Sequence, residues 1–157
     1  MKKRPYNFYA GPAILPLEVM KKIQSELLDT AGTGLSILEI SHRSEEYTEI
    51  NLSARRDLKK ILSIPDNFTV LFLPGGASLQ FAMVPINFLR GGTADYVNTG
   101  TWAKKAIKEA RLFGAVNIAG SSEDKNFSYI PAIDALNFTP DARYVHITSN
   151  ETIGGVQ

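Results

Sequence analysis

A run of small residues in the middle of the chain, Gly75, Gly76, Ala77 and Ser78, has the composition of an anion-binding turn. An apolar run precedes it and a helix-compatible run follows, which predicts a strand, a tight turn and a helix. Glycines let the backbone turn closely, and the first free N–H groups of the helix converge on one place that attracts an anion, most often a phosphate. Ser78 can bind the same phosphate oxygen, or it can cap the helix of an ordinary turn. The run matches neither the nucleotide phosphate loop nor the dinucleotide motif.

A second set of candidate ligand-binding residues, His42 and Arg43, comes just before a helix-start signal. Ser44 suits the N-cap of that helix, and Glu45 and Glu46 suit its positive end, so His42 and Arg43 are expected on a loop. A guanidinium beside an imidazole suits a carboxylate or phosphate ligand. The alternative is a surface ion pair between Arg43 and a carboxylate of the helix.

Trp102 and Thr152 are expected at the same edge of a sheet as Ser78. Trp102, the only tryptophan, opens a helix after a predicted strand at 95–98, and Thr152 follows a predicted strand at 144–148. Turns that follow parallel strands lie at the carboxyl edge of the sheet, so the three side chains should lie near one another. The indole can stack there on a flat heterocycle, although a single tryptophan is also typical of a core.

The histidine and cysteine content excludes several chemistries. With His42, His146 and no cysteine, no cluster has the spacing of metal ligands, and the sequence also lacks the serine nucleophile elbow. His146 lies inside a predicted strand and is expected to be a hydrogen-bonded core or interface residue. The absence of cysteine fits a reducing cytosol, and therefore a cytoplasmic protein.

The overall composition is that of one globular domain. The chain has 157 residues, of which 44% are hydrophobic and 21% charged. Its 17 basic and 16 acidic side chains nearly cancel, so the net charge points to neither a nucleic acid nor a membrane partner. Pro5, Tyr6 and Asn7 stand where a signal peptide would need apolar residues, and no run is long enough to span a bilayer.

The elements that must position these residues alternate between helices and strands, which predicts an α/β fold with a mostly parallel sheet flanked by helices. Residues 1–15 are expected to form an extended N-terminal arm that packs through Phe8 and Tyr9. The helix at 79–89 is apolar almost all round, as in a helix buried against a sheet or a partner subunit. Helices are predicted after Pro16, after Ser44, at 79–89 and at 103–113, strands at 69–73, 95–98, 115–119 and 144–148, and a short helical turn at 131–136.

In order and spacing, these motifs together resemble those of the phosphoserine aminotransferases, fold-type-I, class-V enzymes that use pyridoxal 5′-phosphate. The resemblance covers essentially the whole chain. The residues that carry it are Asn7, Phe8 and 10–13; 41–44; 71–73, 75–78, 80 and 81; Thr99, Gly100 and Trp102; and His146 with 148–153.

The resemblance implies transamination between L-glutamate and 3-phosphohydroxypyruvate, giving O-phospho-L-serine and 2-oxoglutarate in serine biosynthesis, and it leaves open a role in vitamin B6 biosynthesis. It further implies a homodimer with small-molecule substrates. Carried over by position, Gly76, Ala77 and Ser78 would hold the cofactor phosphate, Trp102 would stack on the pyridine ring, and Thr152 would hydrogen-bond its phenolic oxygen.

The substrate contacts that the resemblance implies are Arg43 and His42. Arg43, helped by His42, would bind the distal anion of the substrate, which is a carboxylate in glutamate and a phosphate in phosphoserine. One guanidinium that serves both anions explains how two substrates can share one site.

In the family, the Schiff-base lysine and the aspartate that pairs with the pyridine nitrogen come after the last position matched here. Lys104, Lys105 and Lys108 do not match that lysine and are expected on a solvated helix face, so this chain contains no predicted catalytic residue. Residues 16–157 are therefore expected to be an incomplete, truncated large domain that is inactive alone.

Two alternatives remain beside the aminotransferase. One is a non-catalytic remnant that binds phosphate or pairs with another subunit. The other is a related fold-type-I enzyme, such as another small-substrate aminotransferase or a desulfurase, against which His42 and Arg43 together with Gly76, Ala77 and Ser78 argue.

Overall fold

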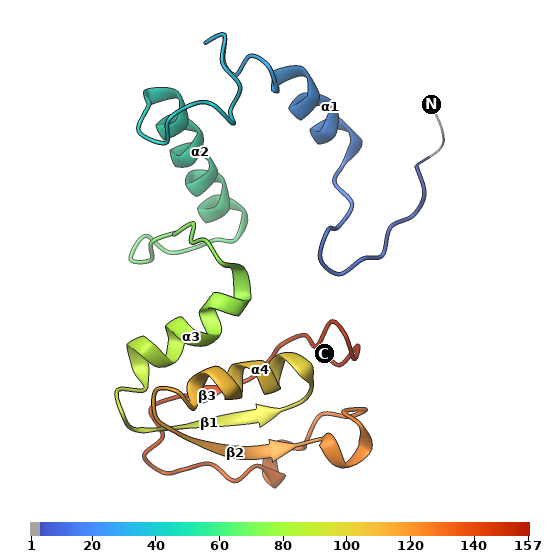
Figure 1. The fold of residues 1–157 in the computed structure, drawn as a ribbon, viewed down its shortest axis with the longest axis vertical. Coiled ribbons are helices and arrows are strands. Elements are labelled where there is room, and N and C mark those ends of the chain that lie inside the picture. The colour runs from blue at the N-terminus through green and yellow to red at the C-terminus, as the bar shows by residue number, and fades with distance from the viewer. Residues whose placement is uncertain (1–3) are drawn as a thin grey trace. The chain divides into compact units, whose positions relative to one another are not determined.

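The computed structural model describes residues 4–157 and divides into two compact units, Met1–Phe72 and Leu73–Gln157 (Figure 1). The first three residues of the predicted arm lie outside the described residues. Among residues 4–157, no helix is both long and apolar enough to cross a membrane.

The first unit contains the helices α1 (Leu17–Glu26) and α2 (Glu45–Ile61). Both begin where local signals predict them. Pro16 is the N-cap residue of α1, and the hydroxyl of Ser44 accepts a hydrogen bond from the N–H of Tyr47, 3.3 Å away, at the start of α2. Residues 4–15 form neither helix nor strand, as expected for an arm. Phe8 stacks on Tyr6 within the arm, with ring centroids 6.4 Å apart. Among residues 4–157, however, Phe8 stays 93% exposed and Tyr9 78% exposed, so the predicted packing of the arm through these two side chains is not seen within this part of the chain.

The second unit is built on a parallel sheet with the strand order β2–β1–β3 (Figure 1). The central strand β1 (Thr93–Asn98) pairs with β2 (Ala115–Ser121) on one side and with the short β3 (Val145–His146) on the other. Two single-turn 3-10 helices, η1 (Glu123–Lys125) and η2 (Ile133–Ala135), lie in the connection between β2 and β3. The parallel α/β prediction is confirmed.

Helices α3 (Gly76–Phe88) and α4 (Thr101–Ala110) complete this unit, and α4 packs against both α3 and β1. The apolar side of α4 and the face of β1 form the core, into which Tyr96 is buried completely. The buried core residues are Leu89, Ala94, Tyr96, Ala106, Ile107 and Ala110.

A buried carboxylate in β1 fixes the connection that follows β2. Asp95 is fully buried and accepts hydrogen bonds from Asn117 Nδ2 at 2.9 Å and from the N–H and hydroxyl of Thr139, both at 2.7 Å. Burial alone would raise the pKa of Asp95, but these three hydrogen bonds stabilise the carboxylate and hold its pKa below the ordinary value.

Three details of the predicted fold are wrong. Residues 69–73 are not a strand, because no described strand pairs with them, and Leu71, Phe72 and Leu73 are each at least half exposed. The strand expected at 144–148 is reduced to the two residues of β3. Helix α3 begins at Gly76 instead of residue 79. Within this chain only Pro85 of α3 is fully buried, and the alternative of burial against a partner subunit stays a prediction.

Candidate functional site

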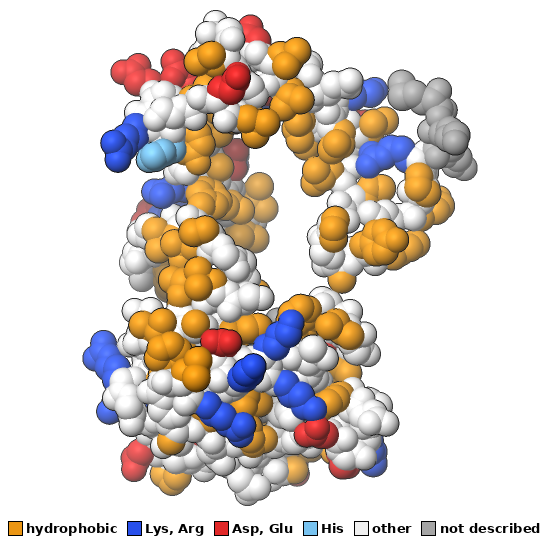
Figure 2. Space-filling view, viewed as in Figure 1, with side chains coloured by type: hydrophobic (Ala, Val, Ile, Leu, Met, Phe, Trp, Pro, Cys, Tyr) orange, Lys and Arg blue, Asp and Glu red, His pale blue; other side chains and the backbone are white. Residues whose placement is uncertain are grey.

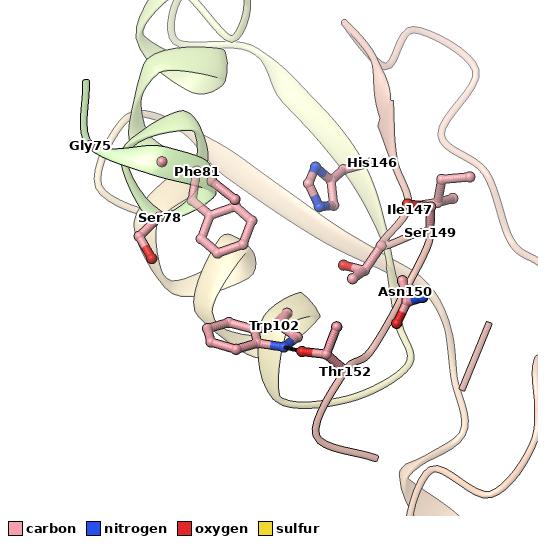
Figure 3. Close-up of a pocket in the computed structure, with 12 residues that line it drawn as sticks. Gly75, Ser78, Phe81, Trp102, His146, Ile147, Ser149, Asn150 and Thr152 are labelled. Atoms are coloured by element: carbon pink, nitrogen blue, oxygen red, sulfur yellow. Dashed lines mark hydrogen bonds between the residues drawn. The ribbon is translucent and has the colours of Figure 1, made fainter. Parts of the chain in front are cut away.

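A cavity of about 430 Å³ opens at the carboxyl edge of the sheet in the second unit (Figure 3). Its walls come from the start of α3, the start of α4 and the segment after β3. All five residues predicted to contact a cofactor line it, namely Gly76, Ala77, Ser78, Trp102 and Thr152. The predicted proximity of Ser78, Trp102 and Thr152 is therefore confirmed, whereas their roles toward a ligand remain predictions.

The backbone at the start of α3 supplies unpaired donors to this cavity. Gly75 is the N-cap residue with φ +88°, and a Cβ there would lie 2.6 Å from Leu79. Within residues 4–157, the N–H groups of Gly76, Ala77 and Ser78 have no hydrogen-bond acceptor. Ser78 is the third residue of the helix, so the interpretation of Ser78 as the N-cap is wrong, and its hydroxyl is available to a ligand.

The N-terminus of α4, in contrast, is capped by a side chain from a segment that is distant in the sequence. The carboxylate of Glu151 accepts hydrogen bonds from the N–H groups of Trp102, at 2.9 Å, and Ala103, at 2.7 Å. Sequence reasoning missed this residue. The one available signal was an acidic residue directly before Thr152 in a polar segment. Of the two helix N-termini beside the cavity, only that of α3 is left open to an anion.

Trp102 is held in place from two sides. Its indole Nε1–H donates a hydrogen bond to the hydroxyl oxygen of Thr152, 2.9 Å away, drawn as a dashed line in Figure 3. The ammonium of Lys105 lies 4.3 Å from the centre of the Trp102 ring, a cation–π contact. Because the Thr152 oxygen accepts from the indole, its own hydrogen is free to be donated to a ligand.

The lysines of α4 lie where they were expected. Lys104, Lys105 and Lys108 are exposed, and Figure 2 shows basic side chains gathered over α4. Lys104 also forms an ion pair with Glu123. None of the three lysines lines the cavity.

His146 lines the cavity beside Phe81. Its Nε2 is buried without a hydrogen-bond partner among residues 4–157, so the expected hydrogen-bonded histidine is not what the structure contains. Burial lowers the pKa of His146, which favours the neutral imidazole. No charged side chain of the described part of the chain therefore lines the cavity, and an anion in it would be met by backbone dipoles and hydroxyls.

His42 and Arg43 belong to the first unit, where both are exposed on the loop before α2. Arg43 forms no ion pair within residues 4–157, so the alternative surface ion pair with a helix carboxylate is absent there. Their role as substrate ligands stays a prediction. In the same described part of the chain, no group of three or more metal-ligating side chains is present.

The donors around the cavity fit a planar heterocycle that carries a phosphate ester. The free N–H groups and the Ser78 hydroxyl suit the phosphate, the Trp102 ring offers a stacking surface, and Thr152 offers a donor. The three features come from three different elements of one unit.

The chain is similar in sequence and fold to known proteins. A phosphoserine aminotransferase of Desulfosudis oleivorans is 58% identical over 100% of this chain, which covers 44% of that relative. The solved phosphoserine aminotransferase of Bacillus circulans subsp. alkalophilus is 49% identical with a TM-score of 0.86, over 94% of this chain and 41% of that one. A solved PLP-bound phosphoserine aminotransferase of Trichomonas vaginalis is 39% identical with a TM-score of 0.87, over 96% of this chain and 46% of that one.

This chain therefore spans less than half the length of each of these relatives. The family description that matches is Aminotransferase class-V, and it matches residues 5–157, almost the whole chain. The chain belongs to the class-V aminotransferase family.

Proposed function

We propose that this chain is part of a phosphoserine aminotransferase that uses pyridoxal 5′-phosphate. The reaction transfers an amino group from L-glutamate to 3-phosphohydroxypyruvate and yields O-phospho-L-serine and 2-oxoglutarate, a step of serine biosynthesis. The observation that carries the proposal is the open N-terminus of α3 beside Trp102 and Thr152 in one cavity. Because the chain spans 44% of its relative's length, the activity is proposed for a protein of that length.

The phosphate of the cofactor is assigned to the start of α3. There the N–H groups of Gly76, Ala77 and Ser78 have no acceptor within residues 4–157, and the positive end of the helix dipole adds to their attraction. The hydroxyl of Ser78 supplies one more donor. The competing helix end, that of α4, is already neutralised by Glu151.

The ring of the cofactor is assigned to Trp102 and Thr152. Trp102 provides a flat surface whose orientation is fixed by its bond to Thr152, and the Thr152 hydroxyl keeps a hydrogen for the phenolic oxygen. When bound, pyridoxal 5′-phosphate supplies the electron sink for proton loss from the amino acid.

The distal anion of the substrate is assigned to Arg43, with help from His42. The guanidinium presents a planar fork of donors that suits both a carboxylate and a phosphate. Both side chains are exposed, and Arg43 is not engaged by a carboxylate within residues 4–157.

We also propose that the intact enzyme is a homodimer. The apolar side chains of the arm and of α3 support a second copy as the partner, since Phe8 is 93%, Ile86 56% and Phe88 62% exposed. Light scattering after size-exclusion chromatography tests this: a mass of two chains is expected, and a monomer at all concentrations would contradict it.

The cofactor site is tested with pyridoxamine 5′-phosphate, because this probe has no aldehyde and cannot form an imine with Lys105 beside the indole. A ring stacked on the only tryptophan should quench its fluorescence saturably. Ser78→Ala should weaken binding about tenfold, the loss of one hydrogen bond to a charged group. Lys108→Ala, on the solvated face of α4, is the matched control and should leave it unchanged.

The outcomes separate the proposal from its alternatives. Saturable quenching that Ser78→Ala weakens supports the cofactor site. Binding of inorganic phosphate without quenching by the pyridoxamine compound would favour the phosphate-binding remnant, and no saturable response to either would contradict the site altogether.

A further inference from the structure

Glu151 joins the start of α4 to the segment that carries Thr152. Its side chain is only 1% exposed, and each carboxylate oxygen accepts one backbone hydrogen bond from α4, Oε2 from Trp102 and Oε1 from Ala103. Its backbone is held as well. The N–H of Glu151 donates to the carbonyl of Val156 at 2.8 Å, and its carbonyl accepts from Gly155 at 2.7 Å. The position of Glu151 is thus fixed through both its side chain and its main chain.

The cap of α4 comes from a segment far along the chain, although a local cap at position 100 would fit if the Glu151 side chain were absent. The N-cap residue Gly100 has extended backbone and no side chain, and its Cβ, if present, would lie 2.6 to 2.9 Å from atoms of Glu151. The three nearest atoms all belong to the Glu151 side chain. A serine at position 100 could therefore cap α4 once that side chain is removed, because extended backbone accepts any residue. The remote cap achieves something that a local cap does not, namely a fixed contact between α4 and residues 149–156.

The residues that Glu151 brings together are the two that face the cofactor ring in the proposed function. Trp102 donates its N–H to Glu151, and Thr152 is the next residue after Glu151 in the chain. With the two backbones held together in this way, the indole Nε1 and the Thr152 oxygen meet at 2.9 Å.

We infer that Glu151 is a positioning residue that sets the contact between Trp102 and Thr152, and through it the orientation of both groups toward the cofactor ring. The inference rests on the proposed function for its ligand, but the contact itself exists without one. Glu151 acts through Trp102 and Thr152 and touches no reacting atom.

The contact can be followed without any ligand, because the chain has a single tryptophan and therefore a single indole N–H resonance in a ¹H–¹⁵N spectrum. Thr152→Val removes the acceptor and gives the reference shift and hydrogen-exchange rate for a free indole N–H. Glu151→Ala should move the resonance toward that reference and speed its exchange, and it should weaken pyridoxamine 5′-phosphate binding about tenfold, as expected for one lost contact.

The decisive variant is the double substitution Gly100→Ser with Glu151→Ala, which replaces the remote cap by a local one. We expect the urea midpoint to recover toward that of the unmodified chain, while the indole resonance and the affinity stay as in Glu151→Ala. If resonance and affinity recover together with stability, Glu151 is only a helix cap and the inference is overturned. Glu151→Gln, which keeps one acceptor oxygen, should lie between the unmodified chain and Glu151→Ala in both readouts.

A matched control is Glu123→Gln, which removes another carboxylate bound to α4 through the exposed ion pair with Lys104. It should change neither the indole resonance nor the affinity. Failure of the proposed function would appear differently, as absence of pyridoxamine 5′-phosphate binding in the unmodified chain. In that case the indole resonance alone decides. If it still moves in Glu151→Ala and in the double variant, the positioning role is supported. If it does not move, the positioning role is overturned.

Discussion

The imidazole of His146 lies flat on the phenol ring of Tyr96, with ring centroids 4.7 Å apart and 19° between the planes. Tyr96 is buried in the core, and its hydroxyl is 2.9 Å from that of Tyr144. Phe81 and the imidazole form a T-shaped pair, with ring centroids 6.2 Å apart and 74° between the planes. His146 is therefore surrounded by aromatic rings, with no carboxylate among these neighbours to stabilise a positive charge.

This environment predicts a loss of stability in mild acid. Burial lowers the pKa of His146 in the folded state, so the unfolded chain takes up the proton first as the pH falls below about 6.5. The free energy of unfolding should fall between pH 7.5 and pH 5, as measured by urea denaturation at several pH values. His146→Phe should flatten this part of the profile, and His42→Asn, at an exposed histidine, is the control. An equal slope in His146→Phe would contradict the assignment.

A second prediction concerns Asp95, which holds the segment at Thr139 against the sheet. Asp95→Ala removes the acceptor of three hydrogen bonds and leaves buried donors unpaired, which should cost about 3 kcal/mol of unfolding free energy. Because its folded-state pKa is lowered, the contribution of Asp95 is present above about pH 3.9 and is lost as the pH falls further. Denaturation at pH 7 and pH 3 checks both points.

Asp141→Ala, at an exposed carboxylate, is the control and should change stability by less than about 0.5 kcal/mol. A similar loss in both variants would mean that charge, and not the hydrogen bonds of Asp95, is responsible.

The features that sequence reasoning found depend on local signals or on topology. Pro16 and Ser44 are start signals that lie directly before their helices in the sequence. Helices α1 and α2 therefore begin where they were predicted. Ser78, Trp102 and Thr152 could be placed together because parallel strands put the turns that follow them at one edge.

The features that it missed depend on partners far along the chain or on backbone conformation. A strand at 69–73 requires a neighbouring strand to pair with, and the composition of the segment does not reveal whether one exists. Among the described residues no such neighbouring strand is present. Glu151 caps a helix 49 residues earlier, beyond any capping pattern. Ser78 has the residue type of an N-cap, but the left-handed conformation of Gly75 places the cap three positions before it.

The two glycines before α3 should differ in their tolerance of a side chain. Gly75→Ala combines a φ of +88° with a Cβ 2.6 Å from Leu79, so it should destabilise the fold by about 3 kcal/mol and weaken phosphate binding. Gly76→Ala has a φ of +58° but no atom within 4 Å of the new Cβ, so only the backbone cost of about 1 kcal/mol is expected. Urea denaturation and phosphate titration of the pair test this order. Equal losses would show that contact with Leu79 does not matter.

The last prediction separates binding from catalysis. Among residues 4–157, no lysine lines the cavity at the start of α3, and transamination on pyridoxal 5′-phosphate requires an amine that moves the proton. We expect the 157-residue chain to quench its tryptophan with pyridoxamine 5′-phosphate yet to show no glutamate-dependent formation of 2-oxoglutarate. A polypeptide of the relatives' length that carries these residues should show both, and Arg43→Ala in it should raise the KM for both substrates at least tenfold while leaving the quenching intact. Glutamate-dependent turnover by the 157-residue chain alone would contradict the expectation, implied by the family resemblance, that none of its lysines is the Schiff-base lysine.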